Sequence, residues 1–224
     1  MSFAPELSNS LTGFDPDVFA TLESLEEGNF WFLARNALIL LALKRHAPQS
    51  RSFLEIGCGT GFVLRAVAEA FPDWALSGSE LHASGLAVAR RRLGTKAEFL
   101  QLDARRLPFE EEFDAIGAFD VLEHIEEDES VLASVAKALR PGGLFIATVP
   151  QHRSLWSPTD DLAHHVRRYA VGELDRKARA CAMTVLMSTS FVTLLLPAMF
   201  ASRALARRSE DHGLEAEMSL GPAA

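Results

Sequence analysis

The chain has 224 residues, which is enough for one sizeable α/β domain but leaves a second full domain cramped. Hydrophobic residues make up 48% and charged residues 23%, as is ordinary for a soluble globular protein. The formal net charge of −8 disfavours a general nucleic-acid-binding protein, because such proteins need basic surface to neutralise phosphates. We therefore expect no nucleic acid among its partners.

The cysteines and the N-terminal residues indicate in which cellular compartment the protein resides. Cys58 and Cys181 are the only cysteines, one in a glycine-rich loop and one in an expected helix, so we expect no disulfide. Residues 1–24 carry polar and acidic side chains where a signal peptide has its apolar core. Both features favour the cytoplasm.

The segment 180–202 raises the question of a membrane, because it has no charged residue and is long enough to span a bilayer. Its Pro197 and several hydroxyl side chains favour a core segment instead. A true span and an interfacial helix, followed by Arg203, Arg207 and Arg208, remain as alternatives. We expect at most a peripheral contact with the inner face of the membrane.

Apolar runs alternate with segments of helical periodicity, which is the pattern of a parallel sheet with crossover helices. Residues 18–46 are expected to be helical, with a break at Gly28 and Asn29. The next expected elements are a strand at 52–56, a helix at 62–71, a strand at 74–79, a helix at 84–93 and a strand at 97–102.

The second half continues the alternation. The expected elements are a strand at 113–119, a helix at 128–139, a turn at 140–143, a strand at 144–149, a long connection at 150–170, a helix at 172–182, a sixth strand at 183–191 and a helix at 194–207. We expect an N-terminal tail at 1–17, one domain at 18–208 and a disordered tail at 209–224.

The strongest motif lies at residues 54–61, which read Leu-Glu-Ile-Gly-Cys-Gly-Thr-Gly and join the first strand to its helix. Glycines at three alternate positions let the backbone approach a ligand closely. A dinucleotide fingerprint would need its third glycine at the position of Phe62. Glu55 is unwelcome beside a pyrophosphate but suits the ammonium group of a zwitterionic amino acid. An NAD-dependent oxidoreductase is therefore disfavoured.

The loop resembles motif I of the class I S-adenosylmethionine-dependent methyltransferases, and it is similar to type 11/12 members related to the ubiquinone-pathway O-methyltransferases. The resemblance covers roughly residues 30–190 and also includes Pro141-Gly142-Gly143 before the fifth strand. It implies that Glu80 binds the ribose hydroxyls and that Asp103 accepts from the adenine amino group. The cofactor-binding residues expected in this way are Trp31, Arg35, Glu55, Gly57, Cys58, Gly59, Gly61, Glu80, Asp103, Ala104 and Phe119.

The resemblance also implies a fold. It predicts an α/β, doubly wound, Rossmann-like and mostly parallel sheet flanked by helices, with seven strands in the family. Nothing after Arg208 has the pattern of a strand, so the seventh is either missing or hidden in 191–199. Residues 18–46 would cover the cofactor, with Trp31 and Arg35 on one helix face and Arg35 reaching the cofactor carboxylate. Core anchoring is an equal alternative for Trp31.

The fourth strand ends in Phe119-Asp120-Val-Leu-Glu123-His124-Ile125, at the edge where ligands bind in open α/β sheets. Three interpretations stay open. His124 could accept a proton from the substrate. Asp120, Glu123, His124 and a later histidine could hold a divalent cation, as in some relatives. Alternatively, Glu123 and His124 only cap and pack the next helix.

The connection at 150–170 is rich in histidine, arginine and aromatic residues, and in the family this region lines the substrate pocket. His165 and Tyr169 are four residues apart and could face the site together, while Arg167 could engage an anionic group. A solvated basic loop is the alternative. His124 and His165 are the expected catalytic residues.

We expect the chain to transfer a methyl group from S-adenosylmethionine to a small organic acceptor. The apolar segment at 180–202 beside a polar loop favours an amphipathic acceptor, such as a quinone-like compound, a lipid or a natural product. The alternative is an S-adenosylmethionine-binding protein without transferase activity. The sequence does not indicate an oligomeric state.

Overall fold

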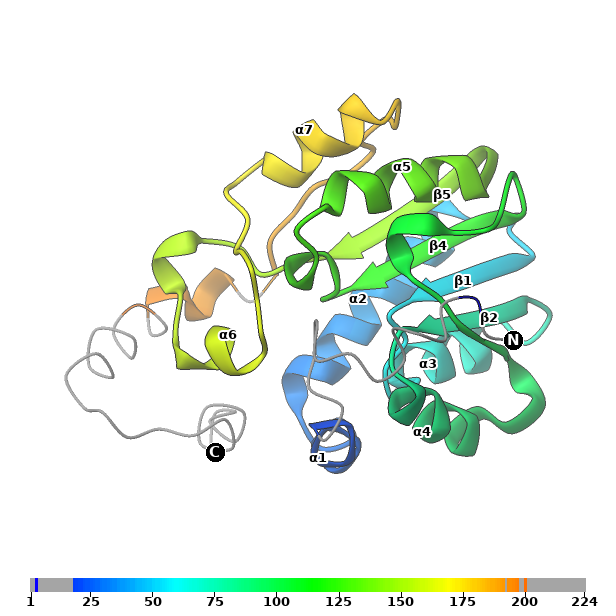
Figure 1. The fold of residues 1–224 in the computed structure, drawn as a ribbon, viewed down its shortest axis with the longest axis horizontal. Coiled ribbons are helices and arrows are strands. Elements are labelled where there is room, and N and C mark those ends of the chain that lie inside the picture. Colours follow the sequence, from blue (N-terminus) through cyan, green and yellow to red (C-terminus); the bar gives the residue numbers. More distant parts are fainter. Residues whose placement is uncertain (1–2, 4–17, 192, 198–199, 201–224) are drawn as a thin grey trace.

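Residues 3, 18–191, 193–197 and 200 are described by the structure, a computed structural model. Five parallel strands form one sheet in the order β3-β2-β1-β4-β5 (Figure 1). The strands are β1 (Ser52–Ile56), β2 (Ala75–Glu80), β3 (Glu98–Gln101), β4 (Phe113–Phe119) and β5 (Leu139–Thr148). The predicted doubly wound parallel sheet is therefore confirmed.

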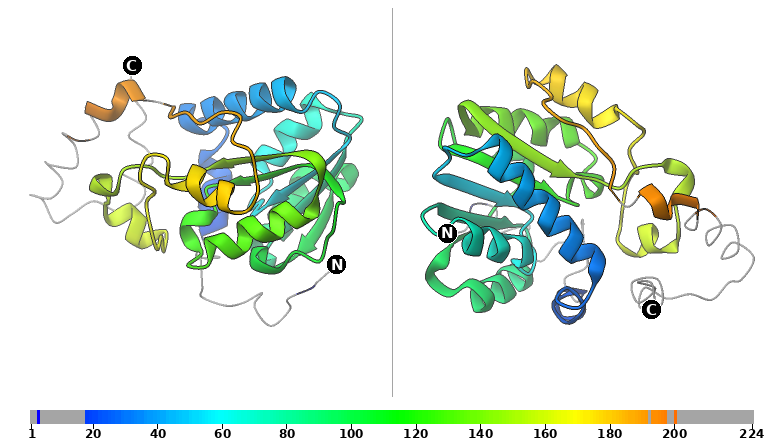
Figure 2. Two further views of the ribbon diagram at one scale, coloured as in Figure 1. Left: turned by 90° about the horizontal axis from the view of Figure 1, so that it is seen from above. Right: turned by 180° about the vertical axis from the view of Figure 1, so that it is seen from behind.

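Helices cover both faces of the sheet (Figures 1 and 2). On one face α2 (Phe30–His46), α3 (Phe62–Ala70) and α4 (Ala83–Leu93) share a core with Phe53 of β1. On the other, α5 (Asp128–Ala138) packs against Leu54, the next residue along the strand. Successive strand residues point to opposite faces, so an unbroken apolar strand is buried on both sides.

The remaining helices are short. They are α1 (Val18–Leu25), α6 (Pro158–Leu162), α7 (Glu173–Ala180) and the 3-10 turns η2 (Gly94–Lys96), η3 (Ala104–Arg106), η4 (Leu122–His124), η5 (Arg153–Leu155) and η6 (Thr193–Leu195). The predicted break between the first two helices is confirmed. Asn29 caps α2 there, because its side chain accepts from the Trp31 backbone N–H at 2.9 Å.

The turn expected at 140–143 lies within β5 rather than before it. Leu139 pairs with Phe113 and Leu144 pairs with Ala115, so the residues between them bulge out of the ladder. Gly142 has φ +79°, which a glycine adopts without strain.

The sixth strand predicted at 183–191 is wrong. The chain runs there without pairing to β5, and Leu186 and Met187 remain 63% and 54% exposed. An apolar run becomes a strand only where a neighbouring strand and a core accept it. No seventh strand occurs in the described part of 191–199, and most of the helix predicted at 194–207, with both tails apart from Phe3, lies outside the described residues.

Two further findings bear on the earlier expectations. Cys58 and Cys181 are both free thiols. Within the described residues, no helix combines the length and the apolar character that crossing a membrane requires.

The order of the strands places a ligand crevice. Because β1 is flanked by β2 on one side and β4 on the other, the chain reverses its direction of winding between them. Ligands of open α/β sheets bind outside the carboxyl ends of the strands at such a point. The glycine loop after β1 and the Asp120–His124 segment after β4 both lie there.

Candidate functional site

The glycine loop after β1 has the backbone that its glycines permit. Gly57 and Gly61 have φ values of +64° and +75°, in the left-handed region. A Cβ on Gly57 would lie 2.5 Å from a methyl carbon of Val121, so no larger residue fits. The loop therefore keeps its backbone bare at the mouth of the crevice.

Helix α1 is fastened to this loop. The Thr60 hydroxyl donates to the Glu26 carboxylate at 2.6 Å, and Arg92 of α4 pairs with the same carboxylate at 2.8 Å. The Phe19 ring lies 3.4 Å from where a Cβ on Gly59 would stand. Phe19 and Glu26 thus hold the N-terminal segment against the loop.

Glu55 stands at the end of β1 and is only 2% exposed. One of its carboxylate oxygens is buried without a hydrogen-bond partner. Burial raises the pKa of Glu55 well above its usual value, and the Arg35 charge opposes this effect. A cationic group such as an ammonium would satisfy this carboxylate.

Glu80 closes β2 beside the loop. Its carboxylate accepts backbone N–H bonds from Gly59 at 3.1 Å, Leu81 at 2.7 Å and His82 at 3.2 Å. Burial raises the pKa of Glu80, while these bonds act in the opposite direction. They also fix the carboxylate, which lines the crevice.

Asp103 follows β3 and caps the turn η3, which begins at Ala104. Arg105 pairs with it at 2.8 Å. Burial acts to raise the pKa of Asp103, but the hydrogen bonds and charge of Arg105 outweigh burial and hold it below its ordinary value. Asp103 is therefore ionised and lines the crevice. It could accept a hydrogen bond from an amino group while it stays paired with Arg105.

Arg35 reaches the crevice from α2. Its guanidinium lies 4.8 Å from the centre of the Trp31 ring and pairs with Asp120 after β4. Thr148 of β5 also donates to Asp120, at 3.0 Å. Trp31 in turn lies 5.7 Å from the Phe191 ring. The structure thus places Trp31 and Arg35 at the site, and Phe119, buried at the end of β4, also lines the crevice.

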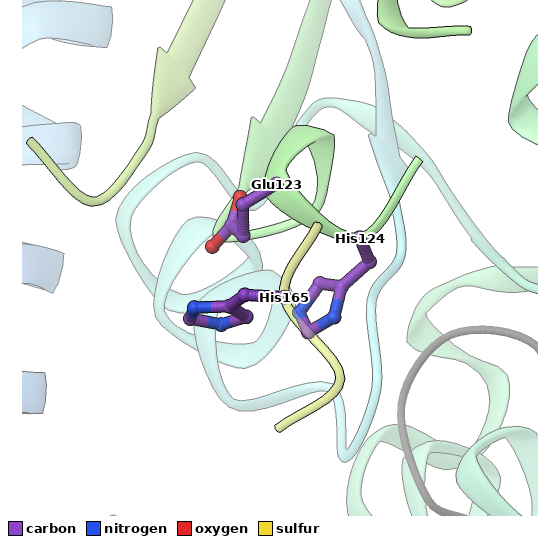
Figure 3. Close-up of side chains that lie close together, drawn as sticks. All are labelled: Glu123, His124 and His165. Carbon is purple, nitrogen blue, oxygen red and sulfur yellow. The ribbon is translucent and has the colours of Figure 1, made fainter. Parts of the chain in front are cut away.

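A second group of side chains lies further along the crevice. Glu123 and His124 leave η4 and converge with His165 of the connection after β5 (Figure 3). Glu123 is 1% exposed, and neither carboxylate oxygen has a hydrogen-bond partner. Burial raises its pKa well above the usual value, and the neighbouring Asp120 raises it further.

His165 is held by Asp160, which the sequence analysis did not identify as a site residue. The His165 Nδ1 lies 2.8 Å from one Asp160 oxygen, and Arg168 donates to the same oxygen at 2.7 Å. The Ser157 backbone N–H donates to the other oxygen at 2.8 Å, within a capping box that starts α6. With Nδ1–H directed at Asp160, Nε2 is the nitrogen left for chemistry.

His124 differs from His165. Burial, then the nearby His165, lowers the pKa of His124 to about 4, although hydrogen bonds to the backbone of Ala163 and His164 oppose the shift. The two rings meet edge to face with centroids 4.7 Å apart. His124 is therefore neutral and a weak base at neutral pH.

Two residues of the connection at 150–170 bond to Asp128 instead of to a ligand. The Tyr169 hydroxyl donates to Asp128 at 2.7 Å, and its ring is buried at the wall of the crevice. Arg167 pairs with Asp128 at 3.0 Å and donates to the Glu126 carbonyl, outside the crevice. The sequence showed the spacing of these residues but not the buried Asp128 that attracts both.

Metal-ligand chemistry was one of the open alternatives. Among the described residues, Glu123, His124 and His165 form a group whose ligand atoms all lie within 4.8 Å of one another. Asp120, which that alternative included, instead bonds to Arg35 and Thr148. The group is thus one carboxylate and two imidazoles, and one of those imidazoles already bonds to the backbone.

Comparisons with known proteins agree with this geometry. A family model described as a methyltransferase domain matches residues 53–143. The chain is 34% identical over 102 residues to a fatty-acid O-methyltransferase of Mycolicibacterium smegmatis, covering 45% of this chain and 37% of that protein. It is 31% identical over 107 residues to a ubiquinone biosynthesis O-methyltransferase of Bordetella avium, covering 45% and 44%. The chain thus spans less than half the length of either relative.

A solved structure is similar over much of the fold. It is CalS10 with bound S-adenosylmethionine, an amino pentose methyltransferase from Micromonospora echinaspora involved in calicheamicin biosynthesis. The sequences are 27% identical and the TM-score is 0.51, with 58% of this chain and 55% of that chain covered.

Proposed function

We propose that this chain is a class I S-adenosylmethionine-dependent methyltransferase, which transfers a methyl group from S-adenosylmethionine to a small organic acceptor. The observation that carries the proposal is the cradle after β1. There a glycine loop lies between Glu55, which is buried with one oxygen unpartnered, and Glu80, which is fixed by three backbone N–H groups.

The residues of the cradle fit the parts of the cofactor. Glu55 would bind the ammonium group, and Arg35, which also pairs with Asp120, would face the carboxylate. Glu80 would take the ribose hydroxyls, and Asp103 with Ala104 the adenine. When bound, S-adenosylmethionine supplies a methyl group that its sulfonium has already activated. The protein then has to bind and align the acceptor, which contributes roughly 7–11 kcal/mol in well-oriented reactions.

His165 is the base we propose for an acceptor that must lose a proton. His165 lines the crevice, and Asp160 holds its ring through Nδ1, which leaves Nε2 for the acceptor. His124 is the weaker candidate, because its pKa of about 4 leaves it little basicity. Its place beside His165 supports a role in packing that ring.

The acceptor we propose has an apolar part as well as a reactive polar group. The aromatic pair Trp31 and Phe191 and the half-exposed Leu162 and Val166 line the same crevice as His165. The relatives named above act on a fatty acid and in ubiquinone biosynthesis. A lipid, a quinone-like compound or a natural product is the class this lining suits.

The proposal is tested with methyl-labelled S-adenosylmethionine, the purified chain and a small-molecule extract of the source cells. We expect label in a small organic product and release of one S-adenosylhomocysteine for each methyl transferred. Tight cofactor binding with no release of S-adenosylhomocysteine would instead favour a binding protein without transferase activity.

A further inference from the structure

The buried Glu123 carboxylate is not explained by the cofactor cradle. It lines the crevice, is 1% exposed, and has no hydrogen-bond partner on either oxygen. Burial makes an unpaired carboxylate costly, so such a group either takes up a proton or ionises beside a cation. Figure 3 shows its carboxylate directed toward the His165 ring.

The arginines that line this part of the crevice are paired with carboxylates other than Glu123. Asp120 is neutralised by Arg35, and Asp160 is neutralised by Arg168. Both arginines therefore already hold a carboxylate, and Glu123 pairs with neither. An anionic acceptor head would meet this third carboxyl group without an arginine to receive it. A cationic head would meet a ready partner.

We infer that the polar head of the acceptor is an amine, which Glu123 binds as the ammonium ion and His165 deprotonates. This inference rests on the proposed methyltransferase function and specifies its substrate class. Glu123 supplies the charge-assisted hydrogen bond, which is the strong kind, and His165 offers Nε2 because Asp160 holds Nδ1.

The proton and electron balance is complete with groups already named. One N–H bond of the ammonium breaks and its proton passes to Nε2 of His165, which leaves a neutral amine. The nitrogen lone pair then forms the new N–C bond while the C–S bond breaks, and its electron pair stays on sulfur. The product is a methylated ammonium ion and S-adenosylhomocysteine. No oxidant or further reactant is needed.

The binding test uses the full chain loaded with S-adenosylhomocysteine, in buffer containing EDTA. Calorimetry compares n-butylammonium with 1-butanol, which share a carbon skeleton and differ in the head group. We expect butylammonium to bind more tightly. Glu123→Gln should weaken butylammonium binding about tenfold or more and leave butanol binding unchanged, because only the charge-assisted bond is lost.

Glu126→Gln is the matched control, since it makes the same change three residues away at an exposed position. Glu126→Gln should change the affinity for neither butylammonium nor butanol. Circular dichroism and affinity for S-adenosylhomocysteine establish that each variant is folded. Equal butylammonium affinity in the wild type and Glu123→Gln would overturn the inference.

Two other cations could satisfy Glu123, and each has its own outcome. If Glu123→Gln weakens the binding of S-adenosylmethionine but not that of S-adenosylhomocysteine, the carboxylate faces the sulfonium and the inference is overturned. If Mg²⁺, Mn²⁺ or Zn²⁺ binds in a Glu123-dependent way and competes with butylammonium, the site belongs to a metal, with the same consequence.

The products of labelled turnover complete the test. The inference predicts a methyl group on nitrogen. A methyl ether, methyl ester or C-methyl product would overturn it while the proposed methyltransferase function stands. Glu123-dependent butylammonium binding without any labelled product would count against the proposed function and not against the amine site.

Discussion

At the scale of single residues, the site depends on carboxylates that differ in their partners. Asp103 and Asp160 each hold an arginine and have a lowered pKa, whereas Glu55 and Glu123 have buried oxygens without partners and a raised pKa. The first kind is stabilised by the protein alone. We propose that a cationic ligand completes the second kind, because both carboxylates line the same crevice.

The adenine role of Asp103 has a direct test. Asp103→Ala should weaken S-adenosylmethionine binding about tenfold or more, because a hydrogen bond to a charged group contributes roughly 1.5–3 kcal/mol. Calorimetry measures the change. Asp73→Ala, at an exposed acid before β2, is the control and should bind normally. Unchanged affinity in Asp103→Ala would remove Asp103 from the adenine site.

Replacing His165 or His124 should lower kcat to different extents. His165→Gln should lower kcat by about 10²–10⁴, the range for loss of a general base, with S-adenosylmethionine affinity unchanged. His124→Gln should have a smaller effect, because the pKa of about 4 already makes His124 a poor base. Steady-state rates and cofactor binding, measured for both variants, check the order. A larger loss in His124→Gln would assign the base to His124.

At the scale of elements, Asp128 joins α5, α7 and the long connection. Lys177 of α7 donates to Asp128 at 2.6 Å, and Tyr169 and Arg167 bond to it as well. Burial acts to raise the pKa of Asp128, but these partners outweigh burial and hold it below 3.8, its ordinary value. The carboxylate thus stabilises the fold above that pH and loses its contribution as pH falls.

Asp128→Asn should therefore lower the free energy of unfolding at pH 7 by about 3 kcal/mol or more, the usual cost of breaking a buried ion pair. The difference from the wild type should shrink below about pH 4, where the unfolded carboxylate gains its proton. Denaturant unfolding at several pH values measures it. Asp175→Asn, in α7, is the control. A difference independent of pH would contradict the ionic account.

Local pattern predicted the regular elements well. The boundaries of β1 and β4 match the predicted ranges, because each is an apolar run bounded by turn residues. The segment 183–191 has the same composition but was predicted wrongly, because pairing with β5 depends on tertiary contacts that composition does not contain.

The site was predictable to the extent that its residues follow strands. The carboxyl ends of the strands meet at one edge of the sheet. Strand ends or the segments that follow them carry Glu55, Glu80, Asp103 and His124. Asp160 was missed, because its pairing with His165 depends on how the connection folds. The Ser157-x-x-Asp160 capping box was the available signal.

At the scale of the whole molecule, the sheet brings two groups of functional side chains to one edge. In the proposed function, the ends of β1, β2 and β3 supply the cofactor cradle, and the segments after β4 and β5 supply the acceptor side with Glu123 and His165. Because the two sets come from neighbouring strands, a methyl donor and an acceptor can meet in line, which is the alignment that such a transfer requires.

The most direct test of this account is transfer of labelled methyl from S-adenosylmethionine by the purified chain, followed in a small-molecule extract. The account predicts one labelled organic product, equimolar S-adenosylhomocysteine, and formation of both slowed by about 10²–10⁴ in His165→Gln. Saturating cofactor binding with no S-adenosylhomocysteine formed, across all acceptors supplied, would contradict it.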